Sequence, residues 1–232
     1  MSFILKTSLA LLGLLAVMSC ETADDNNIEQ ARQCLNNASQ IATGNPPQVT
    51  TAANIARTSC EPLIANVQSA EAGSIGVGIV LVEEGKLNSL TSIQTAVSNG
   101  TSAVTTSISY LVFQTSSDIT TITTYAQRSG DPSEIQLAAI VTLAYYVNIA
   151  SGGNLNSGST PAQVSGYLGT LSSDPVNGPP AAAALLSAQQ NACAGSGATS
   201  TLCTDLTNAV GTNTSSYTAI LTNASTYVGS GG

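Results

Sequence analysis

The chain has 232 residues, a formal net charge of −8 and no histidine, and only 8% of its residues are charged. An acidic chain without a basic cluster repels phosphate backbones, which argues against nucleic-acid binding. The lack of histidine removes the usual general base for a serine or cysteine nucleophile, so we expect no enzyme of that kind. Serine and threonine supply 58 residues, so hydroxyl groups rather than charges keep the surface soluble.

The first twenty residues have the layout of a secretory signal. Lys6 is followed by an apolar run over residues 7–18, and then by the small Ser19 and by Cys20. The apolar run is too short for a helix that crosses the roughly 30 Å hydrocarbon layer of a bilayer. We therefore expect a cleaved leader rather than a membrane span.

Residues 17–20, Val-Met-Ser-Cys, resemble the lipobox of bacterial lipoprotein signals. The resemblance covers only the leader. It implies that residues 1–19 are a signal peptide and that Cys20 is lipidated, so that the membrane is a partner through this lipid. Glu21 follows the cysteine where an inner-membrane lipoprotein has Asp, which favours the outer membrane, with the body facing the periplasm or the cell surface. The alternative is an ordinary secretory signal with Cys20 nearby by chance.

An even number of cysteines remains once Cys20 is assigned to the lipid, and this favours disulfides in an exported chain. Four cysteines allow three connectivities. The shortest loops join Cys34 to Cys60 and Cys193 to Cys203, each inside an expected helix pair. Four free buried thiols are the alternative. We expect no metal site, because the chain has no histidine and no CxxC knuckle.

After the leader, the polar and acidic residues 20–27 are expected to form a short tether. From residue 28 onward, apolar residues recur at spacings of three and four, which predicts an all-α protein. We expect about ten short antiparallel helices, in a bundle or in stacked helical hairpins that loosely resemble repeat scaffolds. Segments with helical character cover residues 28–41, 49–60, 75–82, 87–97, 104–112, 119–126, 132–150, 161–171, 181–195, 202–210 and 217–227, and Glu61-Pro62 is an expected helix start.

These helices fall into an N-terminal region, residues 28–150, and a C-terminal region, residues 160–228, joined by the loop 151–159 as one domain or two. Asp131 and Glu134 form an expected capping box ahead of the most apolar helix, which we expect to be central. The segments at 104–112 and 119–126 are rich in Thr, Val, Ile and Tyr, so propensity favours strands there while spacing favours helices.

Glu83 and Glu84 invite a hypothesis of paired catalytic carboxylates. Adjacent helical residues point about 100° apart, so we expect a solvated helix end instead, although a partnership with the distant Asp118 or Asp131 stays open. Just before them, the glycines of GSIGVG lack the Lys-Ser/Thr of a phosphate-binding loop, so we expect them to serve helix packing.

Four tyrosines are the candidate ligand-binding residues: Tyr110, Tyr125, Tyr145 and Tyr146. Their rings and hydroxyls suit a pocket for a sugar or an aromatic ligand, and the alternative is structural burial with the hydroxyls hydrogen-bonded.

The sequence leads to two main hypotheses about function, neither of which involves a cofactor. The first is a lipid-anchored, non-catalytic envelope protein whose helical body is a structural or protein-interaction scaffold. The alternative is a small-ligand-binding or transport accessory lipoprotein with a tyrosine-lined pocket. An enzyme that works through carboxylates alone ranks third.

Overall fold

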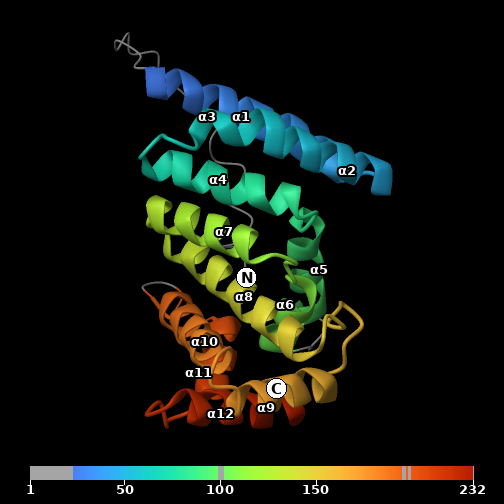
Figure 1. Ribbon diagram of the computed structural model, residues 1–232, viewed down its shortest axis with the longest axis vertical. Helices are drawn as coiled ribbons and strands as arrows, with labels where there is room; N and C mark the ends of the chain where they lie inside the picture. The colour runs from blue at the N-terminus through green and yellow to red at the C-terminus, as the bar shows by residue number, and fades with distance from the viewer. Residues whose placement is uncertain (1–22, 99–101, 195–196, 198–199, 232) are drawn as a thin grey trace.

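A computed structural model of the chain describes residues 23–98, 102–194, 197 and 200–231, and every long element within them is a helix (Figure 1). This confirms the predicted all-α class. The helices are α1 Ala23–Ala42, α2 Pro46–Ile55, the π-helical turn η1 Ala56–Cys60, α3 Glu61–Ile64, α4 Ala70–Glu83, α5 Leu87–Ser98, α6 Ala103–Tyr110, α7 Ser116–Ser129, α8 Pro132–Ala150, α9 Pro161–Ser172, α10 Gly178–Ala192, α11 Thr201–Val210 and α12 Tyr217–Gly229.

The helices form an elongated stack, with α1 at one end and α9 and α12 at the other (Figure 1). Along the stack, α1 packs on α2, α3 and α4, α4 on α7, α7 on α8, α8 on α10, and α10 on α12, which covers α9. Helices α5 and α6 flank this stack on one side (Figure 1). The buried apolar side chains form one contiguous cluster that extends from Ile28 in α1 to Val228 in α12.

The most extensive helix contacts join partners that are not consecutive in the chain: α8 with α10, α9 with α12, and α4 with α7. The chain inserts α5 and α6 between α4 and α7, and α9 between α8 and α10. Helix α8 also contacts α6, α7 and α9, so it holds the central position that its apolar surface predicted. By length and composition it is the one helix in the described ranges able to cross a membrane, but here it serves as a core helix.

Helix α1 begins at Ala23, inside the segment that we predicted to be a tether, so that prediction is wrong for residues 23–27. Asp24 and Asp25 lie in the first turn of α1, where negative side chains interact favourably with the helix dipole. Polar residues that were expected to form the tether therefore form the first turn of α1. Cys20 and the rest of the leader lie outside the described residues.

Pro62 lies in the first turn of α3, as expected for a helix start at Glu61, but α3 continues directly from α2 and η1 in one helical run. In an α-helix, the proline ring would clash with the carbonyl of the residue four positions earlier, Thr58. The π-helical turn at Ala56–Cys60 widens the helix at this carbonyl, which accommodates the ring.

Glycines bring α4 and α7 into close contact, which agrees with the packing role expected for GSIGVG. A Cβ atom added to Gly73 would lie 2.3 Å from the backbone nitrogen of Ser129, and one added to Gly76 would lie 2.3 Å from the ring of Tyr125. Neither position has room for a side chain, so the distance between α4 and α7 depends on both glycines.

Helices α9 and α12 approach each other through serines. The Ser165 hydroxyl donates to the Ser225 carbonyl at 2.8 Å, and the Ser225 hydroxyl donates to the Ser165 carbonyl at 2.9 Å. A Cβ atom on Gly229 would lie 2.8 Å from the Ser165 hydroxyl oxygen. Small side chains and reciprocal hydrogen bonds thus hold this pair of helices together without any charge.

Candidate functional site

The C-terminal end of α4 closes with a Schellman motif that presents Glu84 and Lys86. Gly85 adopts a left-handed conformation, with φ of 63°, which glycine tolerates without strain. The Lys86 amide donates to the Leu81 carbonyl at 2.8 Å, and the Gly85 amide donates to the Val82 carbonyl at 3.1 Å. The turn directs the chain from α4 into α5.

Glu83, the last residue of α4, points into the protein, so the predicted solvated helix end is wrong for this residue. Its side chain is 6% exposed, and its Oε2 lies 4.0 Å from Arg57 Nε. Its Oε1 is buried without a hydrogen-bond partner in the described part of the chain. Burial, reinforced by the nearby Glu61 carboxylate, raises the pKa of Glu83 to about 7.

Glu84 meets Asp118, the distant partner that the sequence left open. The pKa of Glu84 is raised to about 6. Burial is the largest cause, and the charge and the hydrogen bond of Asp118 act in the same direction. Burial lowers the pKa of Lys86, while the charge of Glu84 opposes this shift. The other suggested partner, Asp131, caps α8 instead, and the Ser133 hydroxyl holds its pKa below the usual range.

Tyr125 completes this group of polar residues between α3, α4 and α7. Its hydroxyl donates to Glu61 Oε1 at 3.4 Å, and burial raises its pKa to about 12. The Arg128 guanidinium lies 5.0 Å from the centre of the Tyr125 ring. Arg128 also donates to the carbonyls of Ile64 at 3.1 Å and Val67 at 2.9 Å, so it caps the end of α3.

A polar pocket of about 420 Å³ lies beside this group and shares Lys86 with it. Three segments form its walls: the start of α5, the end of α6 with the residues after it, and the loop between α8 and α9. Tyr110 lines the pocket. Ser109 lines it too and is 5% exposed, and its hydroxyl has no hydrogen-bond partner in the described ranges. The periodicity of the sequence pointed to neither Ser109 nor the loop.

The structure separates the four candidate tyrosines rather than collecting them. Tyr110 lines the polar pocket, and Tyr125 is buried against Glu61. Tyr145 and Tyr146 of α8 form an edge-to-face pair, with ring centres 5.3 Å apart, and pack against the apolar core of the protein. Only Tyr110 among them therefore contributes to this pocket.

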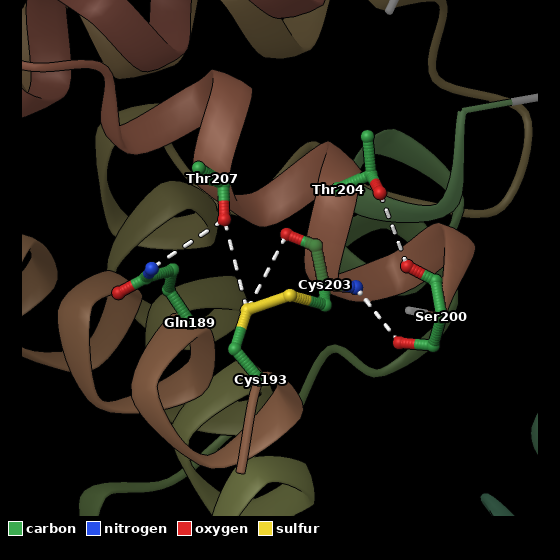
Figure 2. The surroundings of a disulfide bond; sticks show 6 residues. All are labelled: Gln189, Cys193, Ser200, Cys203, Thr204 and Thr207. Carbon is green, nitrogen blue, oxygen red and sulfur yellow. Dashed lines mark hydrogen bonds between the residues drawn. A yellow bond between two sulfur atoms is a disulfide. The ribbon is translucent and has the colours of Figure 1, made fainter. Parts of the chain in front are cut away.

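Both predicted disulfides are present: Cys34 joins α1 to Cys60 at the end of η1, and Cys193 joins α10 to Cys203 in α11. Figure 2 shows the second of these. The Thr207 hydroxyl lies 3.6 Å from Cys193 Sγ and accepts a hydrogen bond from the Gln189 amide at 3.4 Å. Hydroxyl and amide groups thus surround this bridge.

Within the described residues, no three His, Cys, Asp or Glu side chains are placed to hold a metal ion. The end of α4 presents two carboxyl groups with raised pKa values, those of Glu83 and Glu84. The pocket presents one ammonium group, that of Lys86, among hydroxyl and amide groups. No known protein family matches the chain, and neither curated proteins nor solved structures match it.

Proposed function

We propose that this protein is a non-catalytic, lipid-anchored component of the bacterial envelope whose helical body is a scaffold for another protein. The observation that carries the proposal is the lipobox-like sequence at residues 17–20, which assigns Cys20 as the lipidated residue. Disulfides form and persist in oxidising compartments outside the cytoplasm, so the two bridges support an exported location.

The shape of the body supports the scaffold role. Helix α1, which begins three residues after Cys20, lies at one end of the stack, whereas α9 and α12 lie at the opposite end (Figure 1). Each packed helix layer adds about 8–10 Å. A stack anchored at α1 therefore holds α9 and α12 away from the bilayer, where a partner can reach them.

Membrane fractionation of variants tests the anchor. Wild-type protein should remain in the membrane fraction, and Cys20→Ala should move to the soluble fraction because it has no acyl chains. The matched control is Cys193→Ala with Cys203→Ala, which removes cysteines elsewhere and should stay in the membrane. A soluble wild-type protein, or a Cys20→Ala protein that stays bound, would refute the anchor. Crosslinking in the native envelope should then recover a protein joined near α9 or α12.

A second candidate function is the binding of a small molecule, as in a transport accessory lipoprotein. The polar pocket beside Lys86 favours it, because an ammonium group and several hydroxyl and amide side chains line one hollow. The tyrosines do not define this site, since Tyr110 alone among the four lines the pocket.

A further inference from the structure

The first helices form one unit at an end of the stack (Figure 1). Helices α1, α2 and α3 contact one another and η1, and the Cys34–Cys60 disulfide crosslinks α1 to the run of α2, η1 and α3. In the described part of the chain, this N-terminal unit makes its extensive contacts with the rest of the body through α4. Residues 65–69 connect the unit to α4. The unit therefore has one main interface and one chain connection.

The N-terminal unit is held firmly at this connection. Arg128 of α7 donates to the carbonyls of Ile64 at 3.1 Å and Val67 at 2.9 Å. Arg32 of α1 forms an ion pair with Glu71 in the first turn of α4. A movement of the unit would therefore turn about the connection and would separate η1 and α2 from the opposite end of α4.

Glu83 lies at that opposite end of α4. Its side chain is 6% exposed, and its Oε1 is buried with no hydrogen-bond partner among the described residues. Its Oε2 lies 4.0 Å from Nε of Arg57 in η1, whose own side chain is 60% exposed. An ionised carboxylate in this position loses its hydration and gains few hydrogen bonds, which is unfavourable. The closed arrangement therefore favours the protonated form of Glu83.

The charges around Glu83 act in the same direction. Three other carboxylates act on it as negative charges: Glu61 of α3, Glu84 of α4 and Asp118 of α7. Arg57 is the positive charge that opposes them, and Tyr125 of α7 donates to Glu61 at 3.4 Å. Helices α2 and α5 have no charged residue, and Arg32 of α1 is engaged with Glu71. Ionisation of Glu83 thus adds a negative charge to an acidic group of residues.

We infer that the N-terminal unit is a pH-sensitive hinged layer, which stays closed on α4 while Glu83 is protonated and opens transiently about residues 65–69 once Glu83 ionises. In the open form, Glu83 regains water, and the buried apolar residues of α4 become accessible. The disulfide keeps α1, α2 and α3 together during the movement. This motion does not require the lipid anchor, and it differs from global unfolding because the helices from α7 onward stay packed.

Hydrogen exchange of the purified full chain at pH 5 and pH 8, followed by mass spectrometry and corrected for the chemical exchange rate at each pH, tests this motion. At pH 8, the slowest peptides of α2 and α3 should exchange well ahead of those of α8 and α10. At pH 5 they should gain about seventyfold in protection, as expected for a carboxyl with a pKa of about 7 when closed and 4.5 when exposed.

Two outcomes of this experiment would overturn the hinged layer. If α2 and α3 exchange together with α8 and α10 at both pH values, the N-terminal unit opens only when the whole protein unfolds. If α2 and α3 exchange first but their protection is the same at pH 5 and pH 8, the layer opens without any influence of the proton on Glu83.

Variants assign the effect to Glu83. Glu83→Gln stays neutral and should show at pH 8 roughly the protection that the wild type has at pH 5. Arg57→Met removes the positive charge that favours ionised Glu83 in the closed form, so the unit should open more at pH 8. Glu71→Gln is the matched control, because it removes a carboxylate that is 48% exposed and paired with Arg32. It should keep the pH response of the wild type, and a response that survives in Glu83→Gln or disappears in Glu71→Gln would refute the assignment.

Discussion

All five basic residues of the chain lie before residue 129, whereas from residue 135 to the end the only charged residues are Asp174 and Asp205. The two ends of the stack are therefore held together by different chemistry. The interface of α4 with α3 and α7 buries carboxyls, an arginine and a tyrosine. The interface of α9 with α12 uses Ser165, Ser225 and small residues.

This difference indicates how each end responds to its surroundings. Near α4, the free energy of folding depends on which carboxyls carry protons, because Glu83 and Glu84 titrate near neutral pH. Between α9 and α12, neutral hydrogen bonds hold the helices, so their contribution should not change between pH 5 and 8.

The disulfides should give the largest effects. Replacing Cys34 and Cys60 by alanine removes a crosslink with a sequence separation of 26, and replacing Cys193 and Cys203 removes one with a separation of 10. On the chain-entropy model these changes lower the free energy of unfolding by about 3.5 and 3 kcal/mol, respectively. Denaturant unfolding without reductant measures both, and a negligible loss in the first pair would mean that the Cys34–Cys60 disulfide does not stabilise the fold.

Glycine-to-alanine substitutions should give the next largest changes in stability, and these changes should differ between the two ends of the stack. Gly73→Ala places a methyl group against the backbone of Ser129 and should destabilise the protein by about 2–3 kcal/mol, as overpacking does. Gly169→Ala in α9 meets only the Ser225 hydroxyl, at 3.5 Å, and should be neutral or stabilise by up to about 1 kcal/mol through helix propensity. Thermal unfolding compares them, and equal effects would mean that α4 and α7 are not in close contact.

Stability should fall as the pH rises from 5 to 8. The pKa of Glu83 is about 7 in the folded protein against 4.5 as its ordinary value, so the folded state binds the proton more tightly. The resulting stability is fully present below about pH 4.5 and is lost as the pH rises through 7, a change on the order of 2 kcal/mol. Glu84, with a pKa of about 6, acts in the same direction.

Glu83→Gln should reduce this pH dependence to the part that Glu84 contributes, because the amide stays neutral. Asp174→Asn is the matched control from the C-terminal region: hydrogen bonds from Asn177 lower the pKa of Asp174, so its effect falls at acidic pH and has the opposite sign. Denaturant unfolding at a series of pH values measures both variants. A flat profile in the wild-type protein would refute the buried carboxyl at the end of α4.

The serine pair should give the smallest effect. Replacing Ser165 and Ser225 together by alanine removes the two reciprocal hydrogen bonds and should cost about 1–2 kcal/mol. The loss should be the same at pH 5 and at pH 8, and in low and high salt, because no charge takes part. A loss that varies with pH would show that the two ends of the stack are coupled.

Local patterns in the sequence predicted those features that depend on neighbours along the chain. The spacing of apolar residues identified the helices, and the segment at Ala103–Tyr110 is helical despite its strand-forming residues, with all but its last residue buried. The shortest loops identified both disulfides. The capping box expected at Asp131 and Glu134 does not form, since Glu134 accepts a hydrogen bond from Ser74 of α4, whereas Thr160 and Gln163 do form one at the start of α9.

The candidate sites depend on tertiary contacts, which no local pattern contains. Glu83 and Glu84 point in different directions, as adjacent helical residues must. Both are nevertheless partly buried, because η1 and α7 pack against α4. The pocket joins Lys86, Ser109 and Asn156, which are brought together by α5, α6 and a loop. Helical periodicity specifies the buried face of each helix but not the helix that covers it.

The most direct test of the proposed function is the intact mass of the protein extracted from membranes with detergent. A lipid anchor on Cys20 predicts a chain that begins at Cys20, carries the added mass of two or three acyl chains, and contains two disulfides. A chain without acyl mass, or one that begins at another residue, would contradict the lipid anchor.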